Sequence, residues 1–162
     1  VTAHSYKKVS LLDAVDVKDL KPGLKFSYFE NDGNRWDQLP DFSQLKAKTI
    51  GIAESIDLDK AEREENFGLI FEGYFKAPAD GMYTFYSTSD DGSKIYIADR
   101  EVVSNDFLHG MEEQAGKIAL KAGYHLIKIT FFQGEGGEGL EVHFKAADGD
   151  KKLLKDELYY TK

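Results

Sequence analysis

Cysteine is absent from this chain of 162 residues. The absence excludes a disulfide framework and thiolate chemistry, and it leaves the redox compartment undetermined because a cysteine-free protein is compatible with any location. No stretch approaches the roughly 20 consecutive apolar residues that a membrane span requires. The sequence begins at Val1 with neither an initiator methionine nor an apolar signal segment, and we therefore expect an excised or processed piece of a longer protein.

The chain also lacks an excess of basic residues. It holds 21 Lys and Arg against 29 Asp and Glu, a formal net charge of -8 at pH 7. Nucleic acid and anionic membrane surfaces are disfavoured as partners, because both require clustered Lys and Arg, and cations or neutral ligands are favoured. Hydrophobic residues at 41% and charged residues at 31% indicate a globular rather than a disordered protein, and the length fits one domain with a single core.

Helical periodicity is missing, and apolar residues alternate with polar ones instead. Leu140, Val142 and Phe144, for example, share one face of an expected strand, while the residues between them point the other way. We expect strands at 24–30, 69–76, 81–88, 95–97, 101–103, 115–120, 124–132 and 140–146. Short strands separated by glycine turns predict an all-β fold, an antiparallel sandwich or barrel.

The expected domain spans residues 22–162, and residues 1–21 are predicted to be a linker or the tail of a preceding domain. The longest irregular stretch runs from 35 to 68 and contains a charged run at 57–65. For this stretch we predict a single helical turn or a solvated loop.

Two adjacent carboxylates, Asp90 and Asp91, stand with Gly92 at the predicted tip of a β-hairpin. Neighbouring like charges repel, so holding both on one loop costs free energy unless a cation, a hydrogen-bond network or open water stabilises them. The alternative is an ordinary Asp-Gly hairpin turn, which needs no ligand.

The segment 133–139 contains four glycines in seven residues. Glycines allow positive φ and close approach of the main chain, and they leave carbonyl oxygens open to an ion or a sugar. A flexible surface linker is the alternative. Because residues 127–131 alternate onto a core face, the chain should emerge at one end of the sandwich, and we predict that this loop lies beside the Asp90-Asp91 loop.

Two aromatic residues are expected in loops. Phe107 lies in the polar segment 104–110, which suits the rim of a binding site, and Trp36 follows a strong turn at 31–34. Either ring could stack against a sugar. The alternative is a place in the core, where Trp36 would close one end of the sandwich.

Several short motifs occur together in a specific order. They are Gly81-x-Tyr83-Thr84-Phe85, Ser89-Asp90-Asp91-Gly92-Ser93, Asn105-Asp106, His109 and Gly116-x-Ile118-x-Leu120-x-Ala122-Gly123-x-His125. From about Leu24 to Ala146 the chain resembles the protective-antigen-type (PA-fourteen-like) domain. The resemblance implies a β-sandwich with a carbohydrate-binding or adhesive role, commonly appended to secreted glycosidases, toxins and adhesins. It therefore also implies a secreted, periplasmic or cell-surface location.

The resemblance further implies a calcium site. In sugar-binding members of this family, two adjacent aspartates joined by a cis peptide bind calcium, which bridges sugar hydroxyls, and Asp90 and Asp91 match that pair. Gln133 would complete the shell together with carbonyls of Glu135 and Gly137, although Gln replaces the family's Asn and its extra methylene displaces the amide oxygen. Carboxylates, amides and free carbonyls are the hard oxygen ligands that calcium prefers, so calcium is the candidate cofactor.

The leading hypothesis is a non-catalytic carbohydrate-binding module for a glycan or polysaccharide. Its expected ligand-binding residues are Asp90, Asp91, Trp36, Asn105, Phe107, Gln133 and Glu135. The alternative is a structural or adhesive accessory domain that packs against a neighbouring catalytic domain of a secreted glycosidase through an apolar patch and binds no sugar. A hydrolase is disfavoured, because the neighbouring carboxylates do not face each other across a bond and no nucleophile and base set or phosphate loop occurs.

Overall fold

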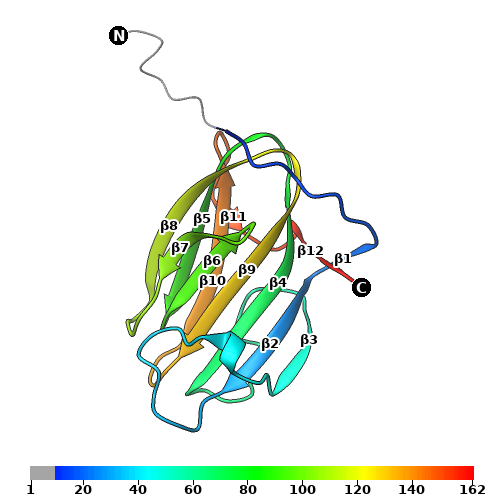
Figure 1. Cartoon of the computed structure of the whole chain (residues 1–162). Coiled ribbons are helices and arrows are strands. Elements are labelled where there is room, and N and C mark those ends of the chain that lie inside the picture. Colours follow the sequence, from blue (N-terminus) through cyan, green and yellow to red (C-terminus); the bar gives the residue numbers. More distant parts are fainter. Residues whose placement is uncertain (1–9) are drawn as a thin grey trace, which may run out of the picture.

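Alternating apolar residues build two antiparallel sheets that pack face to face in this computed structural model, which describes residues 10–162 (Figure 1). The larger sheet contains β1 (Leu20–Pro22), β2 (Leu24–Glu30), β3 (Thr49–Ala53), β4 (Phe67–Ala77), β6 (Ser93–Ile97), β7 (Arg100–Asn105), β9 (Gly123–Gln133) and β12 (Leu158–Thr161). The smaller sheet contains β5 (Gly81–Asp90), β8 (Glu112–Leu120), β10 (Gly139–Ala146) and β11 (Lys152–Leu153). The predicted antiparallel β-sandwich is therefore confirmed.

The two long strands β4 and β9 form the centre of the larger sheet. They pair along their whole length, from Phe67 opposite Gln133 to Ala77 opposite Gly123. On the far edge of β4, β2 pairs with its first half and β12 with its second half, while β6 follows on the other side of β9. The smaller sheet has the order β11-β10-β5-β8 and covers one face of this arrangement.

Aromatic side chains fill the space between the sheets. Phe75 of β4 meets three rings of the opposite sheet nearly edge to face, with centroid distances of 5.6 Å to Tyr83, 5.1 Å to Phe85 and 5.2 Å to Phe144. Such contacts each contribute about 0.5–1.5 kcal/mol beyond the burial of their area. The inward residues of β9 and β10 are buried as their alternation predicts.

The expectation of irregular structure between 35 and 68 is wrong at Thr49–Ala53 and at the first two residues of β4, Phe67 and Gly68. Thr49–Ala53 forms β3, which pairs only with β2 and lies at the sheet edge, while the short 3-10 helix η2 (Phe42–Gln44) supplies the predicted helical turn. The strand was missed because its large apolar residues, Ile50 and Ile52, are on the exposed face and only Ala53 is buried. Ile50 is 74% exposed, so hydrophobicity in this segment does not mark the core.

The segment before β2 contacts the domain at three places. Main-chain bridges join Leu12 to Leu120 and Val15 to Tyr124, and β1 pairs with β12 near the other terminus. Part of the predicted linker, residues 1–9, lies outside the described residues. The boundary at residue 22 stays a prediction.

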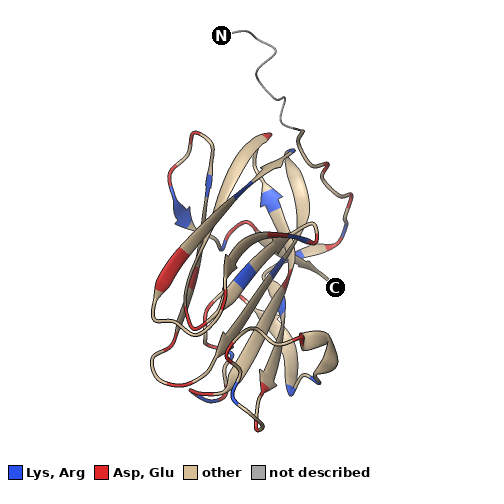
Figure 2. Ribbon diagram, turned by 60° about the vertical axis from the view of Figure 1, so that its left-hand side comes forward, with Lys and Arg blue, Asp and Glu red and all other residues tan. Residues whose placement is uncertain are grey.

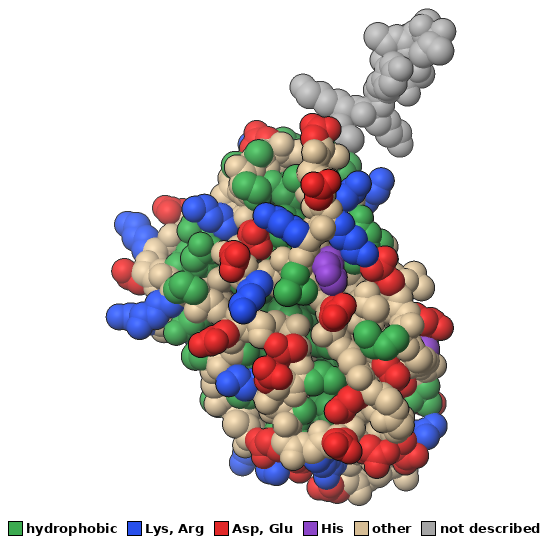
Figure 3. All heavy atoms as spheres, turned by 180° about the vertical axis from the view of Figure 1, so that it is seen from behind, with side chains coloured by type: hydrophobic (Ala, Val, Ile, Leu, Met, Phe, Trp, Pro, Cys, Tyr) green, Lys and Arg blue, Asp and Glu red, His purple; other side chains and the backbone are tan. Residues whose placement is uncertain are grey.

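Several loops gather at one end of the sandwich, the lower end in Figure 1. They are the Asp90-Asp91 turn after β5, the segment 106–111 after β7, the glycine-rich segment after β9 and the segment 31–48 after β2. Figure 2 shows acidic residues in these loops, and Figure 3 shows Asp and Glu side chains gathered over the lower part of the opposite face. The antiparallel register places these four loops together, because the strands that enter them all end at this edge.

Candidate functional site

The Asp90-Asp91 pair lies where β5 ends. The prediction of a hairpin tip is wrong, because β5 belongs to the smaller sheet and the next strand, β6, to the larger one, so the pair lies in a connection between the sheets. The peptide bond between the two residues is cis, as predicted. Asp91 is only 5% exposed. Its Oδ1 accepts a hydrogen bond from the His109 main-chain N–H at 3.2 Å, and its Oδ2 accepts one from the Gly134 N–H at 2.8 Å. The fold therefore holds the Asp91 carboxylate between two neighbouring loops.

Asp90 is in a different environment. Its carboxylate lies beside Gly137: a side chain at that position would bring its Cβ within 3.2 Å of the Asp90 Oδ2. Burial raises the pKa of Asp90, and the negative charge of Asp91 and a hydrogen bond with its side chain raise it further. The charged form of Asp90 is thus disfavoured in the fold, and a bound cation would reverse that effect.

The glycine-rich loop lies beside the pair, so the predicted juxtaposition of the two loops is confirmed. Gly134 donates to Asp91, and Gly139 is paired directly opposite Asp90 in the β5–β10 ladder. Gly136 has φ +88, a conformation that glycine adopts without steric cost. The loop therefore approaches both carboxylates through its main chain.

Gln133, at the end of β9, is completely buried. Its Nε2 donates to the carbonyl of Gly137 at 2.8 Å and to that of Gly136 at 3.3 Å. Its Oε1 is buried and has no hydrogen-bond partner among the described residues. An unpaired buried oxygen is costly, so Gln133 retains an unused acceptor in this part of the molecule.

These oxygens match the chemistry of calcium. Two carboxylates and a buried amide oxygen are hard ligands, and the Gly137 carbonyl keeps one lone pair beside the Gln133 bond. Within residues 10–162, His, Cys, Asp and Glu form no group of three or more that could hold a metal ion. Amide and main-chain oxygens would therefore have to complete any shell that begins with Asp90 and Asp91.

The segment between β7 and β8 forms an apolar rim at this end. Asp106 Oδ1 accepts the Phe107 N–H at 2.6 Å and the Leu39 N–H at 2.8 Å. Phe107 adopts φ +74 and is 60% exposed. Leu108 and Met111 are also exposed, and our sequence interpretation missed both because single apolar residues in a polar loop carry no pattern.

Asn105 and His109 hold this rim in place through side-chain hydrogen bonds to main-chain carbonyls. The Asn105 Nδ2 is buried and donates to the carbonyls of Ser87 at 2.9 Å and Glu112 at 2.8 Å. The His109 ring nitrogens lie 2.7 Å from the Gly110 carbonyl and 2.8 Å from the Asn105 carbonyl. Burial opposes a charged ring, but these two carbonyls outweigh it and raise the pKa of His109, because only the doubly protonated ring donates to both.

The match to a known family covers most of the chain: the PA14 domain matches residues 20–157. The chain belongs to the PA14 domain family. A comparison with curated proteins finds no match.

Solved structures share this fold at low sequence identity. The PA14 domain of the MpAFP antifreeze protein superposes with a TM-score of 0.75 at 20% identity, covering 93% of this chain and 96% of that one. The PA14 sugar-binding domain from an RTX adhesin gives 0.74 at 18% identity, covering 87% and 99%. A subtype-switched Epithelial Adhesin 9 to 1 A domain from Candida glabrata, in complex with beta-lactose, gives a TM-score of 0.71 at 15% identity, covering 98% of this chain and 96% of that one.

The loop after β2 brings two further residues to this PA14 domain's site end. Trp36 is half-buried and packs edge-on against Phe42 at a centroid distance of 6.3 Å. Arg35 forms an ion pair with Glu135 at 3.5 Å. It also lies close to Gly134, because a Cβ at that position would stand 3.7 Å from the Arg35 Cδ. Arg35 was not predicted, because an arginine beside a turn has no spacing that connects it to a loop 100 residues away.

A separate hollow of about 760 Å³ lies on the outer face of the larger sheet, between the segment 38–43 and strands β2, β4, β6 and β9. It reaches Asp106 but includes neither Asp90 nor Asp91.

In residues 10–162 no helix has the length and hydropathy needed to cross a membrane.

Proposed function

We propose that this PA14 domain is a non-catalytic glycan-binding module whose ligand is held at the Asp90-Asp91 end of the sandwich. The observation that carries the proposal is the placement of two carboxylates and an exposed aromatic side chain, Phe107, on adjoining loops. Sugars present hydroxyl groups for hydrogen bonding and apolar ring faces for stacking. This end of the molecule offers both kinds of contact.

Calcium fits this proposal as a cofactor. Asp90 and Asp91 would hold the ion, with Gln133 and the carbonyls of Glu135 and Gly137 as further ligands, and the bound ion would supply coordination to sugar hydroxyls. Asp91 is already fixed by two main-chain N–H groups. The partly exposed Asp90 carries an unfavourable charge that a cation would stabilise.

The remaining predicted ligand residues take different places in the proposal. Phe107 is the exposed ring available for stacking. Trp36 is half-buried and lies at the same end, because the preceding residue, Arg35, forms an ion pair with Glu135 of the glycine-rich loop. Asn105 has its amide nitrogen bound to two carbonyls and holds the loop that presents Phe107. Glu135 lies at the rim in its ion pair with Arg35.

The relatives support a glycan as the ligand class. One solved relative is named a sugar-binding domain, and an adhesin domain was solved with beta-lactose. We extend this to a secreted, periplasmic or cell-surface location for the protein. Asp90 and Asp91 are neighbours on one turn and do not face each other across a bond, which favours binding over hydrolysis.

A structural accessory role beside a catalytic domain is the second candidate. The observation in its favour is exposed aliphatic surface on the edge strand β3, where Ile50 and Ile52 face solvent. Such a surface suits packing against a neighbouring domain, such as a glycosidase. In that role the Asp90-Asp91 loop would bind no sugar.

A glycan array probed with the protein in calcium and again in chelator separates the two candidates. We expect a defined set of glycans to bind in calcium and to be lost in chelator and in the Asp90→Asn variant. Absence of glycan binding in both buffers would overturn the proposal and favour the accessory role.

A further inference from the structure

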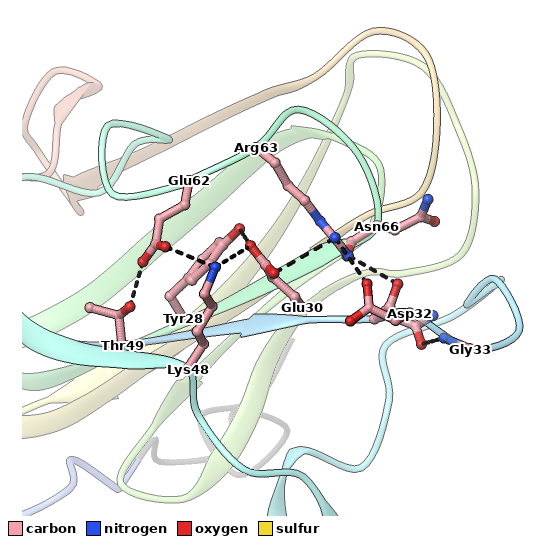
Figure 4. A network of polar contacts seen from close by, with 10 residues as sticks. Tyr28, Glu30, Asp32, Gly33, Lys48, Thr49, Glu62, Arg63 and Asn66 are labelled. Atoms are coloured by element: carbon pink, nitrogen blue, oxygen red, sulfur yellow. Dashed lines mark hydrogen bonds and ion pairs between the residues drawn. The ribbon is translucent and has the colours of Figure 1, made fainter.

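A continuous series of hydrogen bonds connects Arg63, in the charged segment before β4, to the Asp91 carboxylate. The Arg63 Nη2 donates to the Asn66 carbonyl at 2.7 Å and to the Asn31 carbonyl at 3.0 Å. Its Nη1 donates to Asp32 Oδ1 at 3.0 Å. Figure 4 shows the guanidinium between these groups, so that one side chain joins the end of β2 to the start of β4.

Asn66 passes the connection to the glycine-rich loop. Its N–H donates to the Gly134 carbonyl at 2.8 Å, directly beyond the last β4–β9 ladder pair of Phe67 and Gln133. Gly134 in turn donates its own N–H to Asp91 Oδ2 at 2.8 Å. Asn66 and Gly134 each accept one of these hydrogen bonds through the carbonyl and donate the next through the N–H. These two residues thus connect the position of the Arg63 guanidinium to that of the Asp91 carboxylate.

Asn66 has a backbone conformation that suits its residue type. It adopts φ +54, in the left-handed region where asparagine is enriched among residues with a Cβ. Its carbonyl accepts from the Asn31 N–H at 2.8 Å as well as from Arg63. The planar guanidinium can donate to two carbonyls and a carboxylate at fixed angles, whereas a lysine ammonium is a point charge on a flexible stem.

Glu65 makes a second, parallel connection. Its Oε2 accepts the Gly136 N–H at 3.2 Å, two residues after Gly134 in the glycine-rich loop. The carbonyl of the same Gly136 accepts a hydrogen bond from the Gln133 side-chain amide. The segment 63–66 therefore contacts the glycine-rich loop at Gly134 and at Gly136. The other oxygen of Asp91 accepts the main-chain N–H of His109, from the segment between β7 and β8.

We propose that the segment Arg63–Asn66 positions the Asp91 carboxylate and the glycine-rich loop, with Arg63 as the positioning residue that fixes the segment. The inference rests on the proposed function in that calcium is the ligand whose binding depends on this geometry. Residues that orient metal ligands typically change metal affinity by about 10–100-fold when replaced.

The test is calcium titration by calorimetry of the whole chain, at a temperature where each variant is folded. We expect Arg63→Lys, which keeps the charge and loses the fork, to weaken calcium binding by about tenfold or more. The matched control is Arg100→Lys, the same change at an exposed site in the β6–β7 hairpin at the opposite end of the sandwich. This control should bind calcium within about twofold of wild type.

Glu65 provides a second pair of variants, which decides the question if Arg63→Lys does not fold. Glu65→Gln keeps an oxygen that can accept the Gly136 N–H, whereas Glu65→Ala removes it, and neither carries the charge. We expect calcium affinity to be several-fold weaker in Glu65→Ala than in Glu65→Gln. Equal affinities in this pair, or wild-type affinity in a folded Arg63→Lys, would overturn the proposal.

A readout without calcium separates this inference from the proposed function. In chelator, hydrogen exchange of the Gly134 amide should be at least tenfold faster in Arg63→Lys than in wild type, while exchange of core amides in β9 changes little. If wild type binds no calcium but the Gly134 amide responds in this way, the calcium proposal fails and the positioning role stands. If the Gly134 amide is unchanged in a folded variant, the positioning role fails.

Discussion

The two adjacent aspartates should affect stability in opposite directions when calcium is absent. Asp91→Ala removes the acceptor of two main-chain donors, the Gly134 N–H at 2.8 Å and the His109 N–H at 3.2 Å. A donor left unpaired in a buried place costs about 1–3 kcal/mol. Because the bond to Gly134 is buried and the bond to His109 is only partly so, we expect a total loss of about 2–4 kcal/mol. For a domain of this size that is a fall in Tm of roughly 4–16 °C.

Asp90→Asn should instead stabilise the domain in chelator at pH 7. Burial and the charge of Asp91 raise the pKa of Asp90, so the folded state binds this proton more tightly than the unfolded chain does. The ionised Asp90 therefore lowers the free energy of unfolding at every pH above its folded pKa. The advantage of the asparagine should shrink as pH falls through that pKa, because wild type is then protonated as well.

Urea denaturation in chelator, repeated between pH 3.5 and pH 7.5, tests both signs in one series. Asp148→Asn, an exposed aspartate in the turn after β10, is the control and should stay within about 0.5 kcal/mol of wild type. A shift of Asp90→Asn and Asp91→Ala in the same direction at pH 7 would refute the reasoning. In saturating calcium the gain of Asp90→Asn should disappear, since the variant loses a ligand.

Four further outcomes are expected. Calcium at one hundred times its Kd should stabilise wild type by about 2.7 kcal/mol, and equal melting points in calcium and chelator would contradict this. His109 has a raised pKa, so its stabilisation should be complete below pH 6.5 and lost as pH rises through the folded pKa, and His109→Gln should flatten this part of the stability profile. Phe107→Ala should weaken glycan binding about tenfold with little change in Tm, because the residue is 60% exposed. The isolated domain should not hydrolyse chromogenic glycosides, and turnover abolished by Asp90→Asn would contradict the non-catalytic assignment.

The sheets could be predicted from the sequence where one face of a strand is buried. Leu140, Val142 and Phe144 alternate with polar residues, and all three are buried in the core. The period of two along a strand links sequence directly to burial, so no knowledge of the partner strand is needed. The same logic predicted that the glycine-rich loop leaves the sandwich at the Asp90-Asp91 end.

Elements whose partners are far away in the sequence could not be predicted in this way. The edge strand β3 exposes Ile50, and the short strand β12 is defined by its pairing with the second half of β4. Arg63 was read as one charge in a solvated run at 57–65. Its partners include main-chain carbonyls of Asn31 and Asn66, which every residue type possesses and which the fold alone brings together.

Gln133 illustrates the same limit within the site. From sequence, its extra methylene relative to the family's asparagine was an unexplained departure. In the structure the amide nitrogen reaches the carbonyls of Gly136 and Gly137, three and four residues further on, and the side chain thereby supports the loop from its buried side. Residue type indicated which oxygens could meet a cation, but the hydrogen bonds that turn those oxygens toward or away from one another depend on tertiary contacts. The Asp90-Asp91 site is therefore specified twice, by two aspartates that the sequence displays and by hydrogen bonds from the main chain of Asn66 and Gly134 and the side chain of Gln133 that only the folded chain reveals.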